Sequence, residues 1–173
     1  MRLYLNRSEQ SHTFNVRYCI TTVKQKYKIM KRRSTAIWQG DGADGKGTLT
    51  SMSGVLDKTP YSSAARFKNE DGKAGTNPEE LIAAAHSGCY AMALSYALTA
   101  AGFVPDELQV RADVTLDKVT DHFEITGIHL DLAGKVKGIT EEKFLALAAE
   151  AKVNCPVSRA LSAVEITLAA RLV

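Results

Sequence analysis

The feature that most constrains the fold is a long run, Leu81–Pro105, that contains no Asp, Glu, Lys or Arg. The residues before it specify a helix start, because Asn77 is a good N-cap and Pro78 suits the first helical position. Glu80 completes an Asn-x-x-Glu capping box. We therefore predict a helix from residue 77 to about residue 101, where Gly102 ends it.

The uncharged run is long enough to span a bilayer. It is rich in Ala, however, and it contains the polar residues His86, Ser87 and Ser95, with soluble-type sequence on both sides. These features favour a helix buried on all sides by protein, and we predict no membrane role.

Composition narrows the class of protein. The chain has 173 residues, of which 45% are hydrophobic and 24% charged, which fits one globular domain with or without a tail. A formal net charge of +3 is too small to indicate nucleic-acid binding. Three cysteines without regular spacing, and no apolar signal core in residues 1–28, predict a cytoplasmic protein without a disulfide framework.

Two parts are expected. Residues 1–29 do not match the later patterning, and Met30 looks like a second chain start, so we predict an N-terminal extension over 1–29 and one domain over 30–173. Within the domain, alternating or apolar segments predict strands, and capped periodic segments predict helices. The strands are expected at 35–39, 48–52, 108–116, 123–132 and 164–168, and two further helices at 140–151 and 155–161. This pattern predicts an α+β fold with antiparallel sheets and a long apolar helix.

Two cysteines stand in unusual settings. Cys89 lies in the uncharged helix, where an unpaired cysteine is usually a small buried hydrophobe. Cys155 precedes Pro156 at a cap-like position, where helix N–H groups could lower a thiol pKa, although an inert cap thiol fits equally well. Arg66, expected in a loop, could stabilise a thiolate, and Glu79 lies in the first turn of the long helix. A solvated arginine and a helix-start acid are the simpler interpretations of these two.

A zinc site is the other chemistry that these residues allow. His86 lies one turn before Cys89 and could form a three-ligand set with Cys155. The chain has no Cys-x-x-Cys or His-x-x-x-His pairing to support it, so we expect His86 in the core or in a dimer contact and predict no metal.

Several motifs together resemble the OsmC/Ohr family of organic hydroperoxide peroxidases, most closely its OsmC branch. They are Trp38-Gln39-Gly40, Ser53-Gly54-Val55-Leu56, Arg66-Phe67, the run Thr76-Asn77-Pro78-Glu79-Glu80-Leu81 through His86, Cys89, Leu116-Asp117-Lys118-Val119 and Cys155-Pro156-Val157-Ser158. The resemblance implies an OsmC-like α+β fold with long central apolar helices in an intertwined homodimer. It leaves the first residues, including Cys19, without a counterpart.

The same resemblance implies roles for four residues. Cys89 would be the thiolate that attacks the peroxide and becomes a sulfenic acid, and Cys155 would resolve it as a disulfide. Arg66 and Glu79 would form a charged pair that places the guanidinium on the Cys89 sulfur. Recycling by a dithiol, typically a lipoyl-bearing protein, is implied, and no metal, haem or flavin is required.

Helix geometry adds a constraint of its own. Glu79 and Cys89 are ten residues apart, which corresponds to about 15 Å along one continuous helix. One arginine does not easily bridge that distance. Either the helix breaks near Gly88, or Arg66 and Glu79 of one chain reach Cys89 of a second, and we predict the second arrangement, with composite sites in a homodimer.

The function expected from these observations is a peroxidase in oxidative and osmotic stress defence. Three alternatives remain open from the sequence. The thiols could act as a redox sensor, or the dimer could bind an apolar ligand without turnover. A structural dimer with inert thiols would show a Cys89 pKa near the ordinary value of about 8.5.

Overall fold

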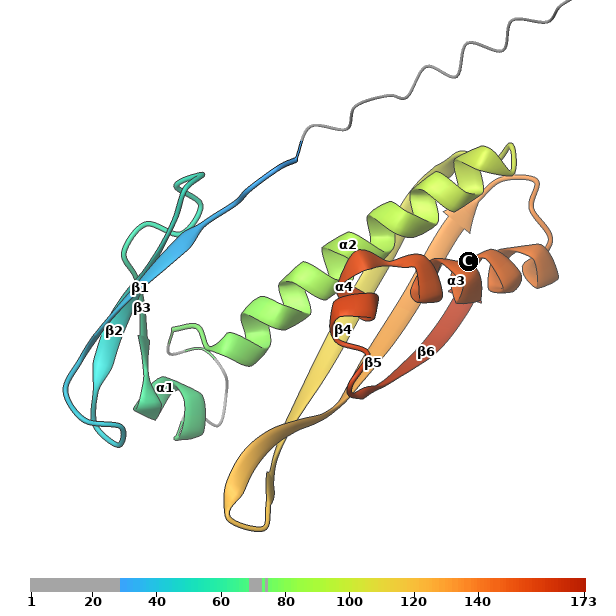
Figure 1. Cartoon of the computed structure of the whole chain (residues 1–173). Coiled ribbons are helices and arrows are strands. Elements are labelled where there is room, and N and C mark those ends of the chain that lie inside the picture. The colour runs from blue at the N-terminus through green and yellow to red at the C-terminus, as the bar shows by residue number, and fades with distance from the viewer. Residues whose placement is uncertain (1–28, 69–72, 74) are drawn as a thin grey trace, which may run out of the picture. The chain divides into compact units, whose positions relative to one another are not determined.

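The computed structural model describes residues 29–68, 73 and 75–173 (Figure 1). Residues Arg33–Val173 form one compact unit. Residues 1–28, and with them Cys19, lie outside the described residues, so the extension expected over 1–29 stays a prediction.

The elements of the compact unit come in runs of strands and pairs of helices, and the α+β class is confirmed. In chain order they are β1 (Ser34–Gln39), β2 (Lys46–Ser51), β3 (Thr59–Ser62), α1 (Ser63–Phe67), α2 (Pro78–Ala100), β4 (Pro105–Val119), β5 (His122–Val136), α3 (Glu141–Asn154), α4 (Pro156–Ala160) and β6 (Glu165–Leu172).

The first sheet has the order β1-β2-β3, with both pairs antiparallel. The predicted β1–β2 hairpin is present, and its turn is built by Asp41, whose carboxylate accepts hydrogen bonds from the N–H groups of Ala43 and Asp44 at 2.9 and 2.8 Å. These bonds lower the pKa of Asp41. At Gly45 an added Cβ would lie 2.6 Å from the Trp38 ring, so the glycine admits the indole to the turn.

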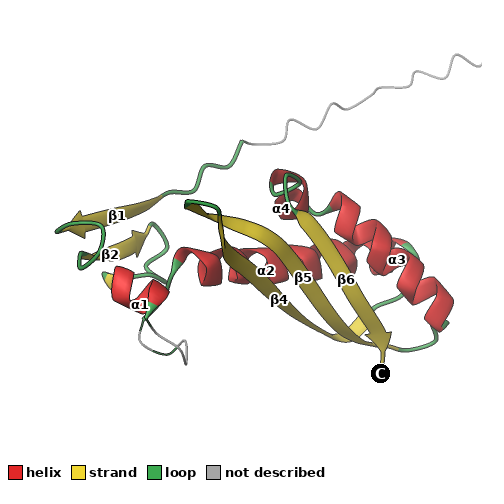
Figure 2. Cartoon of the chain, turned by 90° about the horizontal axis from the view of Figure 1, so that it is seen from below, coloured by secondary structure: helices red, strands yellow, loops and turns green. Residues whose placement is uncertain are grey.

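The second sheet has the order β4-β5-β6. Strands β4 and β5 form the expected long antiparallel hairpin, but β6 pairs with β5 in parallel, which the prediction of antiparallel sheets missed. The reason is the connection, because a helical crossover through α3 and α4 returns the chain in the same direction as β5. Helices α2 and α3 cover one face of this sheet (Figure 2).

Both ends of α2 follow their sequence signals. The Asn77 side chain accepts a hydrogen bond from the Glu80 N–H at 2.8 Å, while the Glu80 carboxylate accepts one from the Thr76 hydroxyl at 2.7 Å. Half of the predicted capping box is therefore present. At the other end Gly102 has φ +88°, and the Phe103 N–H bonds to the Leu98 carbonyl, which is the Schellman arrangement.

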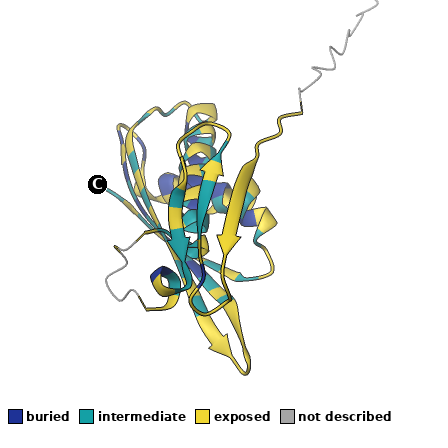
Figure 3. Ribbon diagram, turned by 90° about the vertical axis from the view of Figure 1, so that its left-hand side faces the viewer, coloured by how far each residue is buried: buried dark blue, intermediate teal, exposed yellow. Residues whose placement is uncertain are grey.

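Only one face of α2 is buried in the chain, at His86, Tyr90, Leu94 and Leu98. The expectation of a helix buried on all sides is therefore wrong for the single chain, because a sheet and α3 cover one side alone. On the open side the side chains of Met92 and Tyr96 are 63% and 75% exposed. Strand β1 is exposed along its whole length as well (Figure 3).

Helix α2 is also long and apolar enough to cross a membrane, judged by length and composition. Core helices of soluble proteins meet the same criterion, so the property alone assigns no membrane role.

Two glycines in β5 offer a matched test of this packing. A Cβ at Gly134 would lie 2.4 Å from the Phe144 ring of α3, whereas a Cβ at Gly127 would meet its nearest atom at 3.9 Å. We expect Gly134→Ala to lower the free energy of unfolding by about 1–3 kcal/mol, as overpacking does. Gly127→Ala should leave it nearly unchanged in the same denaturant titration. Equal effects of the two substitutions would contradict this account of how α3 packs on β5.

Candidate active site

Arg66 and Glu79 form a bidentate ion pair, called the charged pair below. The Arg66 Nη2–Glu79 Oε1 distance is 2.5 Å, and Arg66 Nε donates to Oε2 at 3.1 Å. The two side chains are 31% and 12% exposed. A fork-to-carboxylate contact of this kind fixes the orientation of the guanidinium as well as its position.

The sequence predicts a loop at Arg66, and this prediction is wrong, because Arg66 lies in the last turn of α1. The Ser62 hydroxyl accepts a hydrogen bond from the Ala65 N–H at 3.0 Å and caps this short helix. The Arg66 guanidinium carbon also lies 4.9 Å from the centre of the Phe67 ring. The cation is therefore held from two sides, by a carboxylate and by an aromatic ring.

Helix α2 separates the charged pair from Cys89. It runs without interruption from Pro78 to Ala100, so the break considered near Gly88 is absent. Glu79 stands in its first turn, where the helix dipole favours a carboxylate, and Cys89 lies ten residues further on. The rise between them is about 15 Å. Within one chain, the structure does not bring Arg66 to Cys89.

The structure does bring Cys89 and Cys155 together, and we call them the thiol pair. Cys155 ends α3 and begins α4, and α4 packs against α2. Both cysteines are free; Cys155 is fully buried and Cys89 half-buried. The Cys89 thiol interacts with the Cys155 sulfur as a hydrogen-bond donor, since the contact lowers the pKa of Cys155 and raises that of Cys89.

The two sulfurs differ in their surroundings. Burial raises the pKa of Cys89, the Val157 N–H opposes this, and Cys155 raises it further, so the net direction is upward. Burial would also raise the pKa of Cys155, but hydrogen-bonding groups outweigh it and hold that pKa below its ordinary value. They are the Ser158 N–H, the Cys89 thiol, the Ser158 hydroxyl and the Val157 N–H. Cys155 makes no side-chain capping hydrogen bond at the start of α4.

Sequence reasoning missed the partner of His86. The fully buried imidazole makes a hydrogen bond of 2.8 Å between its Nε2 and the Ser158 hydroxyl, so it links α2 to α4 next to Cys155. No local sequence pattern indicates this hydrogen bond, because the two residues are 72 positions apart. The Cys-Pro-Val-Ser motif itself points to Cys155 and not to its serine. Tyr90 is buried as well, and its hydroxyl donates to the Ala148 carbonyl at 3.1 Å.

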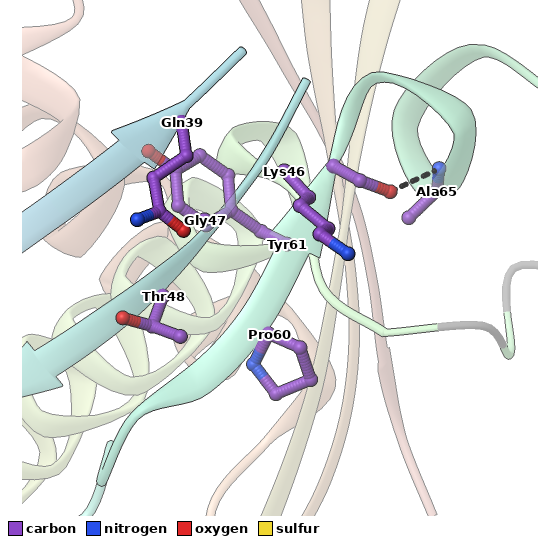
Figure 4. Close-up of a pocket in the computed structure, with 8 residues that line it drawn as sticks. Gln39, Lys46, Gly47, Thr48, Pro60, Tyr61 and Ala65 are labelled. Atoms are coloured by element: carbon purple, nitrogen blue, oxygen red, sulfur yellow. Dashed lines mark hydrogen bonds between the residues drawn. The ribbon is translucent and has the colours of Figure 1, made fainter. Parts of the chain in front are cut away.

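Two hollows lie on the first sheet and α1. One of about 260 Å³ is bordered by Arg66 and by the aromatic side chains Trp38, Tyr61 and Phe67. A larger one of about 380 Å³ is lined by residues of β1, β2, β3 and α1, with Lys46 and Tyr61 at its wall (Figure 4). Neither contains a cysteine. The smaller hollow is the better candidate for a substrate site, because it places apolar space beside the Arg66 guanidinium.

A metal centre finds no support in the part of the chain that the structure describes. No group of three His, Cys, Asp or Glu side chains is placed there so as to hold an ion.

The family model for OsmC-like proteins matches residues 70–169. Peroxiredoxin OsmC of Escherichia coli is 48% identical over 137 residues, which cover 79% of this chain and 93% of that protein. The chain belongs to the OsmC family. The matched range contains Glu79, Cys89 and Cys155 and begins after Arg66.

The fold agrees with this membership. The organic hydroperoxide resistance protein OhrB of Bacillus subtilis is 30% identical over 115 residues, covering 66% of this chain and 80% of OhrB. Its crystal structure superposes with a TM-score of 0.62 and 28% identity, covering 82% of this chain and 98% of that one. An OsmC-like protein of Vibrio cholerae, at 15% identity and a TM-score of 0.66, shares the fold.

The contact within the thiol pair predicts a specific oxidation product. Diamide treatment of the reduced protein should form a Cys89–Cys155 disulfide within one chain, because the two thiols interact across the α2–α4 contact and the oxidant accepts the two electrons. Peptide mapping by mass spectrometry identifies the product, and Cys155→Ser serves as the control. Disulfides that instead join Cys19 to either thiol, or two chains to each other, would contradict the prediction.

Proposed function

We propose that the chain is a thiol-dependent peroxidase that reduces organic hydroperoxides to alcohols in oxidative and osmotic stress defence. The observation that carries the proposal is the contact of Cys89 with Cys155 at the junction of α2 and α4. The names of two relatives, a peroxiredoxin and an organic hydroperoxide resistance protein, support the same chemistry.

Two steps complete the oxidative half of the reaction. The Cys89 thiolate attacks the distal oxygen of R–O–O–H; the S–O bond forms, the O–O bond breaks, and the alkoxide leaves with a proton as R–OH. The Cys155 thiolate then attacks the Cys89 sulfenic acid, forming the disulfide and releasing hydroxide, which is protonated to water. A dithiol, such as a lipoyl group on a partner protein, returns both cysteines to thiols by disulfide exchange. No resident cofactor is needed for either half.

The charged pair takes part from a second copy of the chain in this proposal. The uninterrupted α2 keeps Arg66 away from Cys89 of its own chain, and the open face of α2 with Met92 and Tyr96 offers an apolar surface for another copy. A homodimer would cover that face and bring Arg66 and Glu79 of one subunit to Cys89 of the other.

The electrostatics of Cys89 favour this arrangement. In the single chain burial raises the pKa of Cys89, which leaves the sulfur protonated and a poor nucleophile. A guanidinium placed beside the sulfur lowers a thiol pKa and can also hold a peroxide oxygen. Arg66, already oriented by Glu79, is the cation proposed for this task.

The substrate class follows from the surroundings of Arg66. The hollow beside it is bordered by Trp38, Tyr61 and Phe67, so a lipid-like or aromatic group fits there better than hydrogen peroxide, which has no apolar part. A cytoplasmic location accords with free, reducible thiols.

A redox sensor is the second candidate. The raised pKa of Cys89 in the single chain is the observation that favours it, because a slow thiol that reports oxidation needs no rapid turnover.

Stopped-flow kinetics separate the two candidates. Reduced protein with dihydrolipoamide should turn over cumene hydroperoxide repeatedly and faster than hydrogen peroxide, and Cys89→Ser should abolish turnover.

Arg66→Ala should slow the first step by roughly tenfold or more and shift its pH–rate profile to higher pH, since the thiolate loses its cation. Arg66→Lys keeps the charge but not the fork and should be intermediate. Stoichiometric oxidation without recycling would favour the sensor, and an unchanged profile in Arg66→Ala would remove Arg66 from the site.

A further inference from the structure

A buried hydrogen bond between two helices ends next to the thiol pair. His86 of α2 and Ser158 of α4 are 0% and 7% exposed, and the His86 Nε2–Ser158 Oγ distance is 2.8 Å. A polar contact of this kind in the interior needs both partners, because burying either one alone is costly. It therefore fixes the position of the Ser158 hydroxyl.

Ser158 lies three residues after Cys155, so the two side chains share one face of the turn that begins α4. Its hydroxyl and its N–H are both among the groups that stabilise the Cys155 thiolate. The polar groups thus interact in series: His86 with Ser158, Ser158 with Cys155, and Cys155 with Cys89.

The Ser158 hydroxyl has one proton, and the tautomer of His86 decides where that proton can point. Among the described residues, His86 Nδ1 is buried and has no hydrogen-bond partner. If Nδ1 carried the imidazole proton, a buried N–H donor would be left without an acceptor, and unpaired donors are rarer in interiors than unpaired acceptors. The proton therefore belongs on Nε2, which donates to Ser158 Oγ. The hydroxyl proton is then free to point at the Cys155 sulfur.

We propose that His86 is a positioning residue, which holds the Ser158 hydroxyl with its proton directed at Cys155 and so keeps Cys155 ready to attack oxidised Cys89. This inference rests on the proposed peroxidase function for its meaning, but not for its test. The step it serves is balanced: Cys89–SOH and Cys155–SH give the disulfide and water, the S–S bond forming as the S–O bond breaks.

His86 does not act as a charge in this arrangement. Burial lowers its pKa, so the ring is neutral near pH 7, and the Nε2–H is present in this neutral form and in the imidazolium alike. The other titratable groups that interact with Cys155 are Cys89, whose thiol donates to it, and Tyr90. Burial and then Cys155 raise the pKa of Tyr90, so the phenol stays neutral, with its proton on the Ala148 carbonyl.

The test measures the Cys155 pKa directly, from the ultraviolet absorbance of the thiolate against pH. The background is Cys19→Ser with Cys89→Ser, in which Cys155 is the remaining cysteine. Ser158→Ala should raise this pKa by about one unit, the effect of losing one hydrogen bond to a charged sulfur. His86→Asn, whose amide is too short to reach Ser158, should raise it in the same direction. His86→Gln, with one methylene more, should restore it toward the parent value.

The double variant His86→Asn with Ser158→Ala should have the same Cys155 pKa as Ser158→Ala alone, because His86 acts only through the Ser158 hydroxyl. In the protein with Cys89 and Cys155 intact, His86→Asn should lengthen the lifetime of the Cys89 sulfenic acid after a peroxide pulse.

Two results would overturn the proposal: a folded His86→Asn protein with an unchanged Cys155 pKa, or a shift that adds fully to that of Ser158→Ala. If His86→Asn does not fold, an unchanged pKa in Ser158→Ala overturns it on its own. A protein that does not reduce peroxides but shows these shifts would refute the proposed function and leave the link from His86 to Cys155 standing.

Discussion

The continuity of α2 is the constraint on which the rest of the site depends. An unbroken helix from Pro78 to Ala100 fixes Glu79 and Cys89 about 15 Å apart, whatever the side chains do. The bidentate contact holds Arg66 at the N-terminal end of this helix, beside Glu79. Cys155 reaches the Cys89 end from α4. A single chain therefore holds the charged pair and the thiol pair at separate places on one helix, and a second copy is the means we propose to bring them together.

The surface of the same helix accords with this view. Its buried stripe, spaced every four residues from His86 to Leu98, faces the sheet and α3, while Met92 and Tyr96 on the other side remain exposed. Large apolar side chains such as these are costly to leave in water. Covering it with another copy would remove that cost and would also lower the dielectric around Cys89, where a nearby guanidinium acts most strongly.

The sequence predicted what local signals specify and missed what distant contacts decide. The limits of α2 followed from Asn77, Pro78 and Gly102, because caps and a positive φ act within a few residues. The ion pair of Arg66 with Glu79 and the meeting of Cys89 with Cys155 were expected only through the family resemblance. The parallel pairing of β6 and the bond between His86 and Ser158 arise from packing between segments far apart in the chain, and no local pattern encodes them.

Subunit complementation tests the composite site most directly. In the proposed homodimer, co-expressed Arg66→Ala and Cys89→Ser chains should form mixed dimers in which Cys89 of one subunit faces Arg66 of the other. Toward cumene hydroperoxide, Cys89→Ser alone should be inactive and Arg66→Ala alone slower by roughly tenfold or more. Random mixing should restore about a quarter of the wild-type sites, since half of the dimers are mixed and each has one complete site. If Arg66 and Cys89 act within one chain, no mixed dimer contains a complete site. Absence of recovery in mixed dimers isolated with two different affinity tags would therefore contradict the account.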